Sequence, residues 1–316
     1  MTGGRLPAAI PMSQTTMSQT RPPTPTWQRF GLAIPYAWLL LFFLAPFLIV
    51  LKISLADPIV AQPPFTPLFD AARAPGSQLY ATAENYRFVL ADRLYLLTYL
   101  NSLELAAVST LLCLLVGYPM AYGIARARPG TRNTLLLLVI LPFWTSFLLR
   151  VYAWMGILNS HGTLNNVLLW AGLIDRPLEI LYTNTAVFLG MAYSYLPFMI
   201  LPLYANLARL DLDLLDAAAD LGARPRQVFR DVTLPLSLPG VIAGCLLVFI
   251  PAIGEFVIPA LLGGDDTLMI GRVVYDEFFL NRDWPVASAV AVLLLLLLLV
   301  PIAIFQRYEA EGEPRT

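Results

Sequence analysis

Residues 289–305 read AVAVLLLLLLLVPIAIF and contain no polar side chain. About 20 consecutive apolar residues cross the hydrocarbon core of a bilayer, which is about 30 Å thick. The run therefore predicts a membrane-spanning helix near residues 286–306. Of the 316 residues, 58% are hydrophobic and 13% are charged, whereas an ordinary soluble domain has roughly 25% charged residues. The composition predicts an all-α polytopic membrane protein.

Five further apolar stretches have the length of a membrane span, near residues 31–54, 100–124, 133–158, 184–208 and 239–262. Six transmembrane helices are therefore expected within a membrane domain over residues 29–308. Residues 1–28 are rich in Pro, Thr, Ser and Gln, which is typical of a disordered tail, and residues 309–316 are expected to form a second tail. A cleavable signal peptide has an apolar core of about 7–15 residues near its start. Here the stretch is longer and comes later, so the first span is expected to be retained.

The placement of the basic residues predicts the orientation, because Arg and Lys are enriched on the cytoplasmic side. With the N-terminus inside, twelve of the 20 basic residues lie on the inner side and six on the outer side. The other two, Lys52 and Arg150, lie within spans. Both termini are therefore expected to be cytoplasmic. The outer six are Arg73, Arg87, Arg93, Arg176, Arg272 and Arg282.

The outer loops carry eleven acidic residues against these six arginines. The last outer loop, residues 263–285, alone contains five acids and two arginines. A negative entrance would raise the local concentration of cations. The alternative interpretation is a solvated loop that docks a partner protein.

Several classes of chemistry are excluded by single residue types. Lys52 is the only lysine and no glycine-rich loop precedes it, so the chain has no P-loop for ATP. His161 is the only histidine and falls in an outer turn, and no aspartate lies within a span, so neither a two-histidine metal site nor an intramembrane hydrolase is expected. The net charge of −1 does not suggest a nucleic-acid surface. Cys113 and Cys245 both fall in apolar runs and are expected to be small buried hydrophobic residues.

The longest inner loop, residues 209–238, reads RLDLDLLDAAADLGARPRQVFRDVTLPLSL. Asp213 is expected to cap a short helix, with Asp216 favouring its positive end. Gly222 is expected to end that helix in the left-handed conformation, and Pro225 to open a second helix. The loop is therefore predicted to be a two-helix projection that docks into a groove of another protein.

At this point the chain resembles the permease subunits of bacterial ABC importers, whose signature is the EAA loop. The matching residues are Asp216, Ala217, Ala218, Gly222, Val232, Leu234 and Pro235, with Asp in place of Glu and Val in place of Ile. The resemblance implies a type I ABC importer permease fold, in which this loop is the coupling helix. It also implies that the chain itself has no cofactor and is not an enzyme, because ATP and Mg belong to a separate ATPase subunit.

Over most of the chain after residue 80, the likeness is greatest to the permeases of putrescine/spermidine importers. It is carried by Pro142–Gly156, Asn159–Asn166 with Trp170, Gly254–Gly264 and Met269–Pro285. This resemblance implies a bacterial inner-membrane permease for polyamines that forms half of a translocation pathway. The implied partners are a homologous second permease, two ATP-binding subunits, an extracytoplasmic solute-binding protein and membrane lipid. Sister importers for iron, phosphonate or thiamine remain the alternative.

Three charged residues are expected in the outer half of the membrane, namely Glu104, Arg150 and Glu255. Such residues are costly to place in a bilayer and are usually paired or functional. In one interpretation, Arg150 neutralises Glu255 or Glu104 as an ion pair. In the other, Glu255 lines the substrate pathway and accepts an ammonium group, because Gly254 and nearby prolines loosen the fifth span. The second interpretation requires Arg150 to be paired or turned away.

Aromatic residues of the third and fourth spans complete the candidate pathway. Tyr152, Trp154 and Tyr195, together with Trp144 and Tyr193, could make cation–π contacts with amines. The alternative is that they anchor the chain at the membrane interface. A passive channel or an assembly protein remains a further alternative, but neither would need a loop that docks an ATPase.

Overall fold

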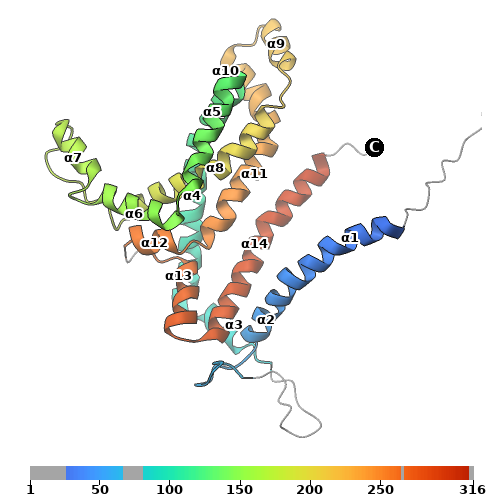
Figure 1. The fold of residues 1–316 in the computed structure, drawn as a ribbon, viewed down its shortest axis with the longest axis vertical. Helices are drawn as coiled ribbons and strands as arrows, with labels where there is room; N and C mark the ends of the chain where they lie inside the picture. Colours follow the sequence, from blue (N-terminus) through green and yellow to red (C-terminus); the bar gives the residue numbers. More distant parts are fainter. Residues whose placement is uncertain (1–25, 67–80, 265–266, 313–316) are drawn as a thin grey trace, which may run out of the picture. The chain divides into compact units, whose positions relative to one another are not determined.

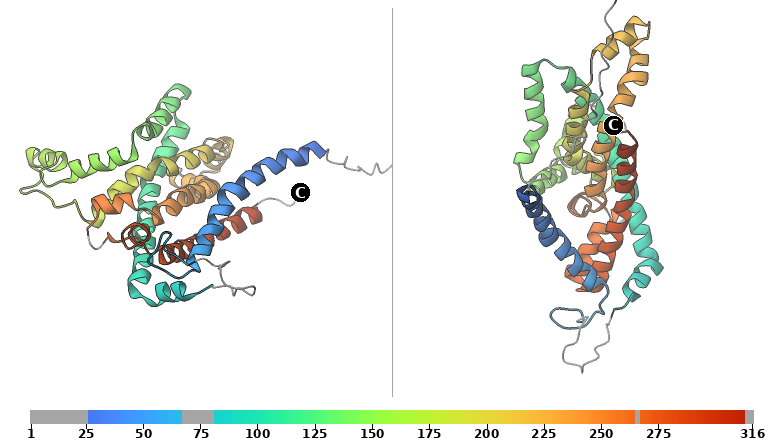
Figure 2. Two further views of the ribbon diagram at one scale, coloured as in Figure 1. Left: turned by 60° about the horizontal axis from the view of Figure 1, so that its bottom comes forward. Right: turned by 90° about the vertical axis from the view of Figure 1, so that its right-hand side faces the viewer.

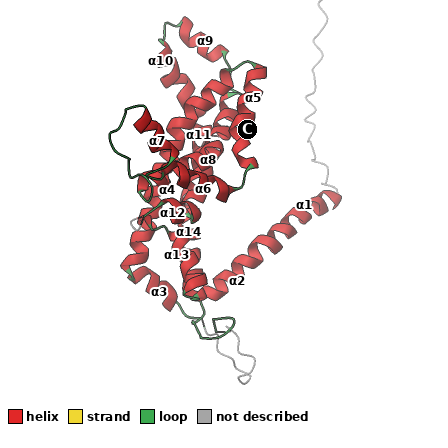
Figure 3. Cartoon of the chain, turned by 60° about the vertical axis from the view of Figure 1, so that its left-hand side comes forward, coloured by secondary structure: helices red, strands yellow, loops and turns green. Residues whose placement is uncertain are grey.

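The computed structural model describes residues 26–66, 81–264 and 267–312, and the described chain consists of helices joined by loops (Figure 3). Within these residues the only β pairing is an isolated bridge between Pro58 and Phe65. The expected N-terminal tail lies outside the described residues, except that Thr26–Gln28 already belong to the first helix. The chain divides into two compact units, one ending at Ile49 and the other beginning at Val50.

The first unit contains helix α1 (Thr26–Leu39), the π-helical turn η1 (Leu40–Leu44) and the first half of α2 (Ala45–Ser54). The amide of Ala45 bonds to the carbonyl of Leu40, five residues back. Pro46 follows and has no N–H to donate, which accounts for the local widening of the helix. Residues 33–54 are long and apolar enough to cross a membrane, as predicted for the first span.

The second unit begins with the rest of α2 and continues through a series of helices and short helical turns. These are α3 (Glu84–Ala91), α4 (Arg93–Arg126), α5 (Pro129–Ile140), η2 (Leu141–Trp144), α6 (Phe147–Leu158), α7 (Thr163–Trp170), α8 (Asn184–Leu207), α9 (Asp213–Asp220), α10 (Pro225–Val228), η3 (Phe229–Thr233), α11 (Leu234–Ile253), α12 (Val257–Leu262), α13 (Ile270–Tyr275), η5 (Asp276–Leu280) and α14 (Trp284–Gly312). Helices α4, α8 and α14 confirm the second, fourth and sixth predicted spans.

Helices α4, α8 and α11 lie side by side and form the core of this unit (Figures 1 and 2). Met199 of α8 is fully buried between Gly117 of α4 and Gly244 of α11. A Cβ added to Gly244 would lie 2.8 Å from the Met199 sulfur and 3.2 Å from its carbonyl oxygen. Small residues let membrane helices approach closely, and here they leave room for one methionine. Cys113 is also buried here, and both cysteines are free.

Replacing Gly244 by Ala is therefore expected to destabilise the protein, although Ala favours helix formation. Overpacking of this kind typically costs about 1–3 kcal/mol. The matched control is Gly123→Ala on α4, because an added Cβ there meets nothing within 4 Å. The melting temperature of the purified protein in detergent should fall for Gly244→Ala and stay the same or rise for Gly123→Ala. Equal melting temperatures would contradict the close packing around Met199.

The third predicted span, residues 133–158, is not one straight helix in the structure. Residues 129–144 and 147–170 meet at 93°, with the bend at Thr145 and Ser146. The Thr145 hydroxyl and amide both donate to the Pro142 carbonyl, at 2.8 Å and 3.2 Å, so a 3₁₀ turn replaces the α-helical bonds there. The described residues thus contain five single-helix candidate spans, or six if the bent pair counts as one.

The fifth predicted span, residues 239–262, is also interrupted. Helix α11 is continuous with η3 and α10, so the helical run covers Pro225–Ile253 and then stops. Pro259 has no N–H for the carbonyl of Glu255, and its ring crowds that carbonyl, which disfavours a continuous helix through both residues. At the other end of the chain, α14 continues through residues 309–312 of the expected C-terminal tail.

Candidate functional site

Two sets of candidate residues lie in different parts of the second unit. The coupling loop α9–α10 projects at one end, and α3, α13 and the start of α14 lie toward the opposite end (Figure 1). The charged and aromatic pathway candidates are carried by α4, α6, α8 and the break between α11 and α12.

The first part of the coupling loop is helix α9 with the turn that ends it. Gly222 has φ of +85°, and its amide donates to the carbonyl of Ala219 at 2.9 Å. The amide of Ala223 donates to the carbonyl of Ala218 at 3.1 Å. These two bonds form a Schellman motif with Gly222 in the left-handed position. The predicted helix terminator is therefore confirmed.

The start of α9 differs from the prediction that Asp213 caps it. Asp213 is the first helical residue, and its amide donates to the carboxylate of Asp211 at 3.1 Å. Asp213 and Asp216 both lie in the first turn, where negative charge is favoured by the helix dipole. In the sequence Asp211-Leu212-Asp213, either aspartate has a carboxylate that could accept a hydrogen bond at the start of the helix. In the structure it is Asp211, two residues before the first helical residue, that does so.

The second part of the loop is anchored to α4. Pro225 opens α10 as predicted, and the Phe229 ring packs edge-on against Tyr118 and Tyr122 near the C-terminal end of α4. Their ring centroids lie 5.7 Å and 6.1 Å from that of Phe229. The sequence interpretation did not single out Phe229, although an aromatic residue within a charged loop was a signal for such an anchor.

The signature residues of the coupling loop occupy both parts. Asp216, Ala217 and Gly222 are exposed and Ala218 is half-buried, whereas Val232, Leu234 and Pro235 lie at the junction of η3 and α11. Apolar side chains also point outward from this loop, since Leu212, Leu214 and Leu221 are exposed. Exposed apolar side chains next to short rigid helices are typical of a surface that another protein covers.

Glu255 lies at the break between α11 and α12 and caps the second helix. Its Oε1 accepts hydrogen bonds from the amides of Phe256, Val257 and Ile258 at 3.1, 2.9 and 3.4 Å. Its Oε2 accepts a hydrogen bond from the hydroxyl of Tyr195, which is 7% exposed on α8. The structure therefore joins two of the predicted pathway residues, Glu255 and Tyr195, in one hydrogen-bonded site.

The predicted ion pair between Arg150 and Glu255 is not formed in the structure. The Arg150 guanidinium lies over the rings of Phe143 and Phe147, at 5.3 Å and 5.7 Å from their centroids. Its Nε is buried without a hydrogen-bond partner, and within the described ranges Arg150 makes no salt bridge. The 93° bend explains the difference, because Arg150 belongs to the arm beyond the bend and not to a straight span.

The other candidate residues are dispersed. Trp154 packs edge-on against Tyr193, with ring centroids 5.5 Å apart. Tyr152 and Trp144 are exposed, and so is Glu104 on α4. The five aromatic residues therefore form no single cage in this chain. His161 lies in the turn between α6 and α7, where its amide donates to Asn159, as expected of a loop residue.

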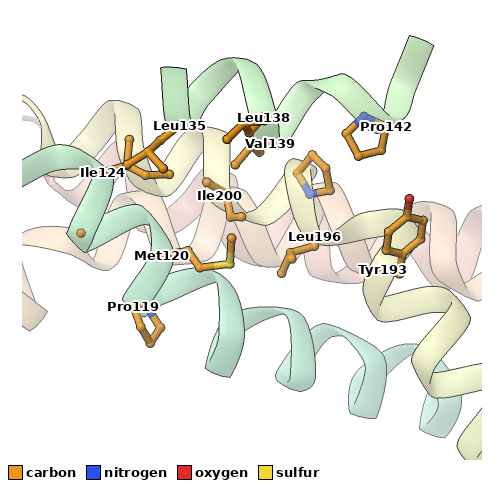
Figure 4. Close-up of a pocket in the computed structure, with 12 residues that line it drawn as sticks. Pro119, Met120, Ile124, Leu135, Leu138, Val139, Pro142, Tyr193, Leu196 and Ile200 are labelled. Atoms are coloured by element: carbon orange, nitrogen blue, oxygen red, sulfur yellow. The ribbon is translucent and has the colours of Figure 1, made fainter. Parts of the chain in front are cut away.

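A separate apolar pocket lies between α4, α5 and α8 (Figure 4). Its lining includes Met120, Ile124, Leu138, Leu196 and Ile200, and Tyr193 reaches its edge. Neither Glu255 nor Glu104 lines it. A cation in this pocket would lose its hydration without gaining a counter-charge, so the pocket does not suit a charged solute.

Residues 26–310 match the family described as binding-protein-dependent transport system inner membrane component. The chain is 42% identical over 287 residues to the spermidine/putrescine transport system permease protein PotB of Haemophilus influenzae, covering 90% of this chain and 94% of that protein. It is 42% identical over 255 residues to PotB of Escherichia coli K12, covering 81% of this chain and 88% of that protein.

Among solved structures, the chain is similar in fold to a bacterial ABC transporter involved in the import of the acidic polysaccharide alginate. The TM-score is 0.65 at 17% identity, and the match covers 91% of this chain and 96% of that chain. At this identity the likeness concerns the fold alone. It agrees with the type I importer permease fold that the coupling loop predicted.

Proposed function

Because the chain belongs to the family of binding-protein-dependent transport system inner membrane components, we propose that it is the permease subunit of an ATP-driven importer of polyamines, putrescine or spermidine. Two relatives named for spermidine/putrescine transport match it at 42% identity over most of their length. The single observation that best supports the proposal is this identity, which covers 90% of this chain and 94% of the Haemophilus influenzae relative.

The chain is proposed to form half of the translocation pathway, with a homologous second permease forming the other half. Glu104 supports this arrangement. It is exposed on α4 within a stripe of exposed apolar side chains that includes Leu97, Leu100, Leu111 and Leu115. An ionisable side chain in a membrane helix rarely faces lipid. A second permease covering this face would place Glu104 beside the pathway, where it can attract an amine.

Two ATP-binding subunits are proposed to hold ATP and Mg and to bind the coupling loop from the cytoplasm, so that ATP hydrolysis takes place outside this chain. Alternating access would then follow from rigid-body motion of the two permeases. Within this chain, the Phe229 contacts with Tyr118 and Tyr122 couple movement of α10 to α4. Both chain termini are proposed to be cytoplasmic, which places α9–α10 on the same side as the twelve inner basic residues.

Glu255 is proposed to hold its position through the α12 amides while its charge faces the pathway. Its Oε2 is bonded to Tyr195, a residue that can rotate its hydroxyl away from the carboxylate. An ammonium group of a diamine could then replace the Tyr195 hydroxyl as the hydrogen-bond donor to Oε2. Arg150 lies over two phenylalanine rings and, among the described residues, makes no salt bridge with Glu255. This supports the requirement that Arg150 be turned away from a cationic substrate.

The proposal is tested by measuring uptake of labelled putrescine in cells that express the whole importer. Saturable uptake that unlabelled spermidine blocks is the expected result, whereas ferric iron and phosphonate should not compete. Cells that express the importer with this chain deleted are the control. An assembled complex that takes up no polyamine would contradict the substrate class, and competition by iron or phosphonate would favour a sister importer instead.

A further inference from the structure

The apolar pocket between α4, α5 and α8 is a groove with two different ends (Figure 4). Ile124 and Leu135 lie at one end, and Pro142 and Tyr193 lie at the other. We call it the α5 groove. Its volume is about 550 Å³, within the range of roughly 300–1,000 Å³ that small-molecule sites have. The function proposed above does not use the groove, because its lining offers no counter-charge to a cationic solute.

Helix α5 leaves the groove open because it packs loosely on its neighbours. None of the residues of α5 is buried, although residues 135–140 read LLLLVI. Leu138 lines the groove and is 55% exposed, and Met120 on the facing side of α4 is 40% exposed. In a membrane such a surface is covered either by another protein or by lipid tails, which are as apolar as leucine.

The end of the groove that contains Leu135 is bordered by a basic turn, which joins α4 to α5. Arg126, Arg128 and Arg132 lie in this turn, and residues 105–174 contain no Asp or Glu. Arg132 lies three residues before Leu135, and residues at this spacing are neighbours on one side of a helix. The groove therefore has one positively charged end.

The acidic residues of the neighbouring coupling loop do not neutralise this turn. The contact between Phe229 and Tyr122 brings the end of that loop close to the turn, and the acid there, Asp231, pairs with Arg230 at 2.7 Å. Within the part of the chain that the structure describes, neither the aspartates of α9 nor any other acid forms a salt bridge with the three arginines. Their charge is therefore available to an anion.

Two nitrogens of these arginines are buried and have no hydrogen-bond partner among the described residues, namely Arg126 Nη2 and Arg132 Nε. Both guanidinium groups are held by other contacts. The Arg126 group lies over the Tyr122 ring at 5.2 Å from its centroid, and Arg132 Nη2 donates to the carbonyl of Ala125 at 3.0 Å. A buried donor on a charged group is costly when it has no acceptor. The two arginines are thus positioned but incompletely bonded.

The length of the groove corresponds to one leaflet of a bilayer. Arg132 and Pro142 are ten residues apart along α5 and η2, which at 1.5 Å per residue is roughly 15 Å. The hydrocarbon core of a bilayer is about 30 Å thick, so one leaflet has about the same depth. A charged group at one end and an apolar channel of this depth are the two features of a phospholipid site.

We propose that the α5 groove binds an anionic phospholipid, with the phosphate at Arg126 and Arg132 and one acyl chain along α5. Basic pockets between membrane helices bind anionic headgroups, and a guanidinium group can bond a phosphate through two parallel hydrogen bonds. The acyl chain completes the packing of a helix that buries none of its own residues. The inference goes beyond the proposed function and does not depend on which solute is transported.

The test uses the assembled importer in nanodiscs made from equal parts of phosphatidylglycerol and phosphatidylethanolamine. A trace of phosphatidylglycerol carries a photoreactive group on its acyl chain, and mass spectrometry locates the labelled residues. Labelling is expected at Met120 and Leu138, which line the groove. Photoreactive phosphatidylethanolamine should label them about tenfold less, because its ammonium group cancels the charge that the basic turn attracts.

Arg132→Gln tests the charged end of the groove. Its amide group can still donate to the carbonyl of Ala125, so the end of α4 stays bonded while the charge is lost. Labelling by phosphatidylglycerol should fall about fivefold, because each basic residue adds to the attraction for an anionic lipid. Arg209→Gln is the matched control, since Arg209 is exposed just after α8 and does not line the groove. It should leave the labelling unchanged.

Gly123→Phe tests the apolar part of the groove. Gly123 lines it, and an added Cβ meets nothing within 4 Å, so a larger side chain begins in open space. The variant is expected to abolish labelling of Leu138 with all three arginines in place, whereas Gly123→Ala should retain it. Phosphatidylglycerol should also raise the melting temperature of the wild type and of Gly123→Ala but not of Gly123→Phe, because a ligand stabilises only the protein that binds it.

Three outcomes would overturn the inference. Equal labelling by the two lipids would show that the turn does not recognise the charge of the headgroup. Undiminished labelling in Gly123→Phe would place the acyl chain outside the groove. No labelling of the groove by either lipid would show that another subunit covers it in the assembled importer. If Gly123→Phe fails to assemble, the comparison of Arg132→Gln with Arg209→Gln decides, and equal labelling of those two would contradict the site.

Discussion

Polyamine uptake should be abolished when Gly222 is replaced by Val, although the permease still inserts and assembles. Gly222 has φ of +85°, a conformation that a β-branched residue adopts at a cost of more than about 1–2 kcal/mol. Relieving that strain would break the hydrogen bonds from Gly222 and Ala223 to the end of α9. The chain would then leave α9 in another direction, and the two halves of the coupling loop could no longer bind one surface together.

The control for this prediction is Gly222→Asn, because asparagine adopts positive φ far more readily than valine. A Cβ added at this position meets nothing within 4 Å, so the first side-chain atom of either variant has room within the chain. Gly222→Asn is expected to keep most of the uptake, and both variants should appear in the membrane at wild-type level. Uptake and substrate-stimulated ATP hydrolysis would be measured on the same preparations. If both variants lose activity equally, side-chain bulk on the docking surface matters and the backbone conformation does not.

Replacing Glu255 by Gln should reduce polyamine uptake about tenfold or more while the importer assembles normally. The amide oxygen of Gln can still accept the N–H groups of Phe256 and Val257, so α12 remains capped. What is lost is the negative charge, and a hydrogen bond to a charged group contributes about 1.5–3 kcal/mol. The initial rate of labelled putrescine uptake, normalised to the amount of complex, measures this effect.

Glu255→Ala separates the two roles of this residue. It removes the cap as well as the charge, so it is expected to lower the amount of assembled complex, since capping groups contribute about 0.5–2 kcal/mol. Tyr195→Phe removes only the hydroxyl that bonds Oε2 and should leave assembly intact. Normal uptake by Glu255→Gln, together with loss of complex in Glu255→Ala, would show that Glu255 is a helix cap and not part of the pathway.

The span pattern and the coupling loop could be predicted well from the sequence because both depend on neighbouring residues. A run of apolar residues must be helical in a bilayer whatever it packs against. The spacing from Asp216 to Pro235 likewise lies within a single segment. The Gly222 terminator and the Pro225 start were correct for the same reason, since each follows from the backbone of one residue.

The bends were only partly predictable. The prolines and Gly254 in the third and fifth spans signalled weak points, but prolines also occur in continuous membrane helices, such as Pro119 in α4 and Pro197 in α8. Whether a proline interrupts a helix depends on whether neighbouring groups satisfy the freed carbonyls and amides. At Glu255 the side chain itself satisfies three amides, and this allows the break to persist.

The sequence by itself determined the class of protein, the number of membrane segments to within one bend, and the turn at Gly222 in the loop over residues 209–238. These follow from local hydrophobicity and short-range spacing. The tertiary structure alone decided how the charged residues are used. Glu255 is bonded to Tyr195, 60 residues away, and Arg282 lies in a pocket completed by residues 61–64. Such pairings depend on how separate helices pack, and the charge of one residue does not indicate which distant group satisfies it.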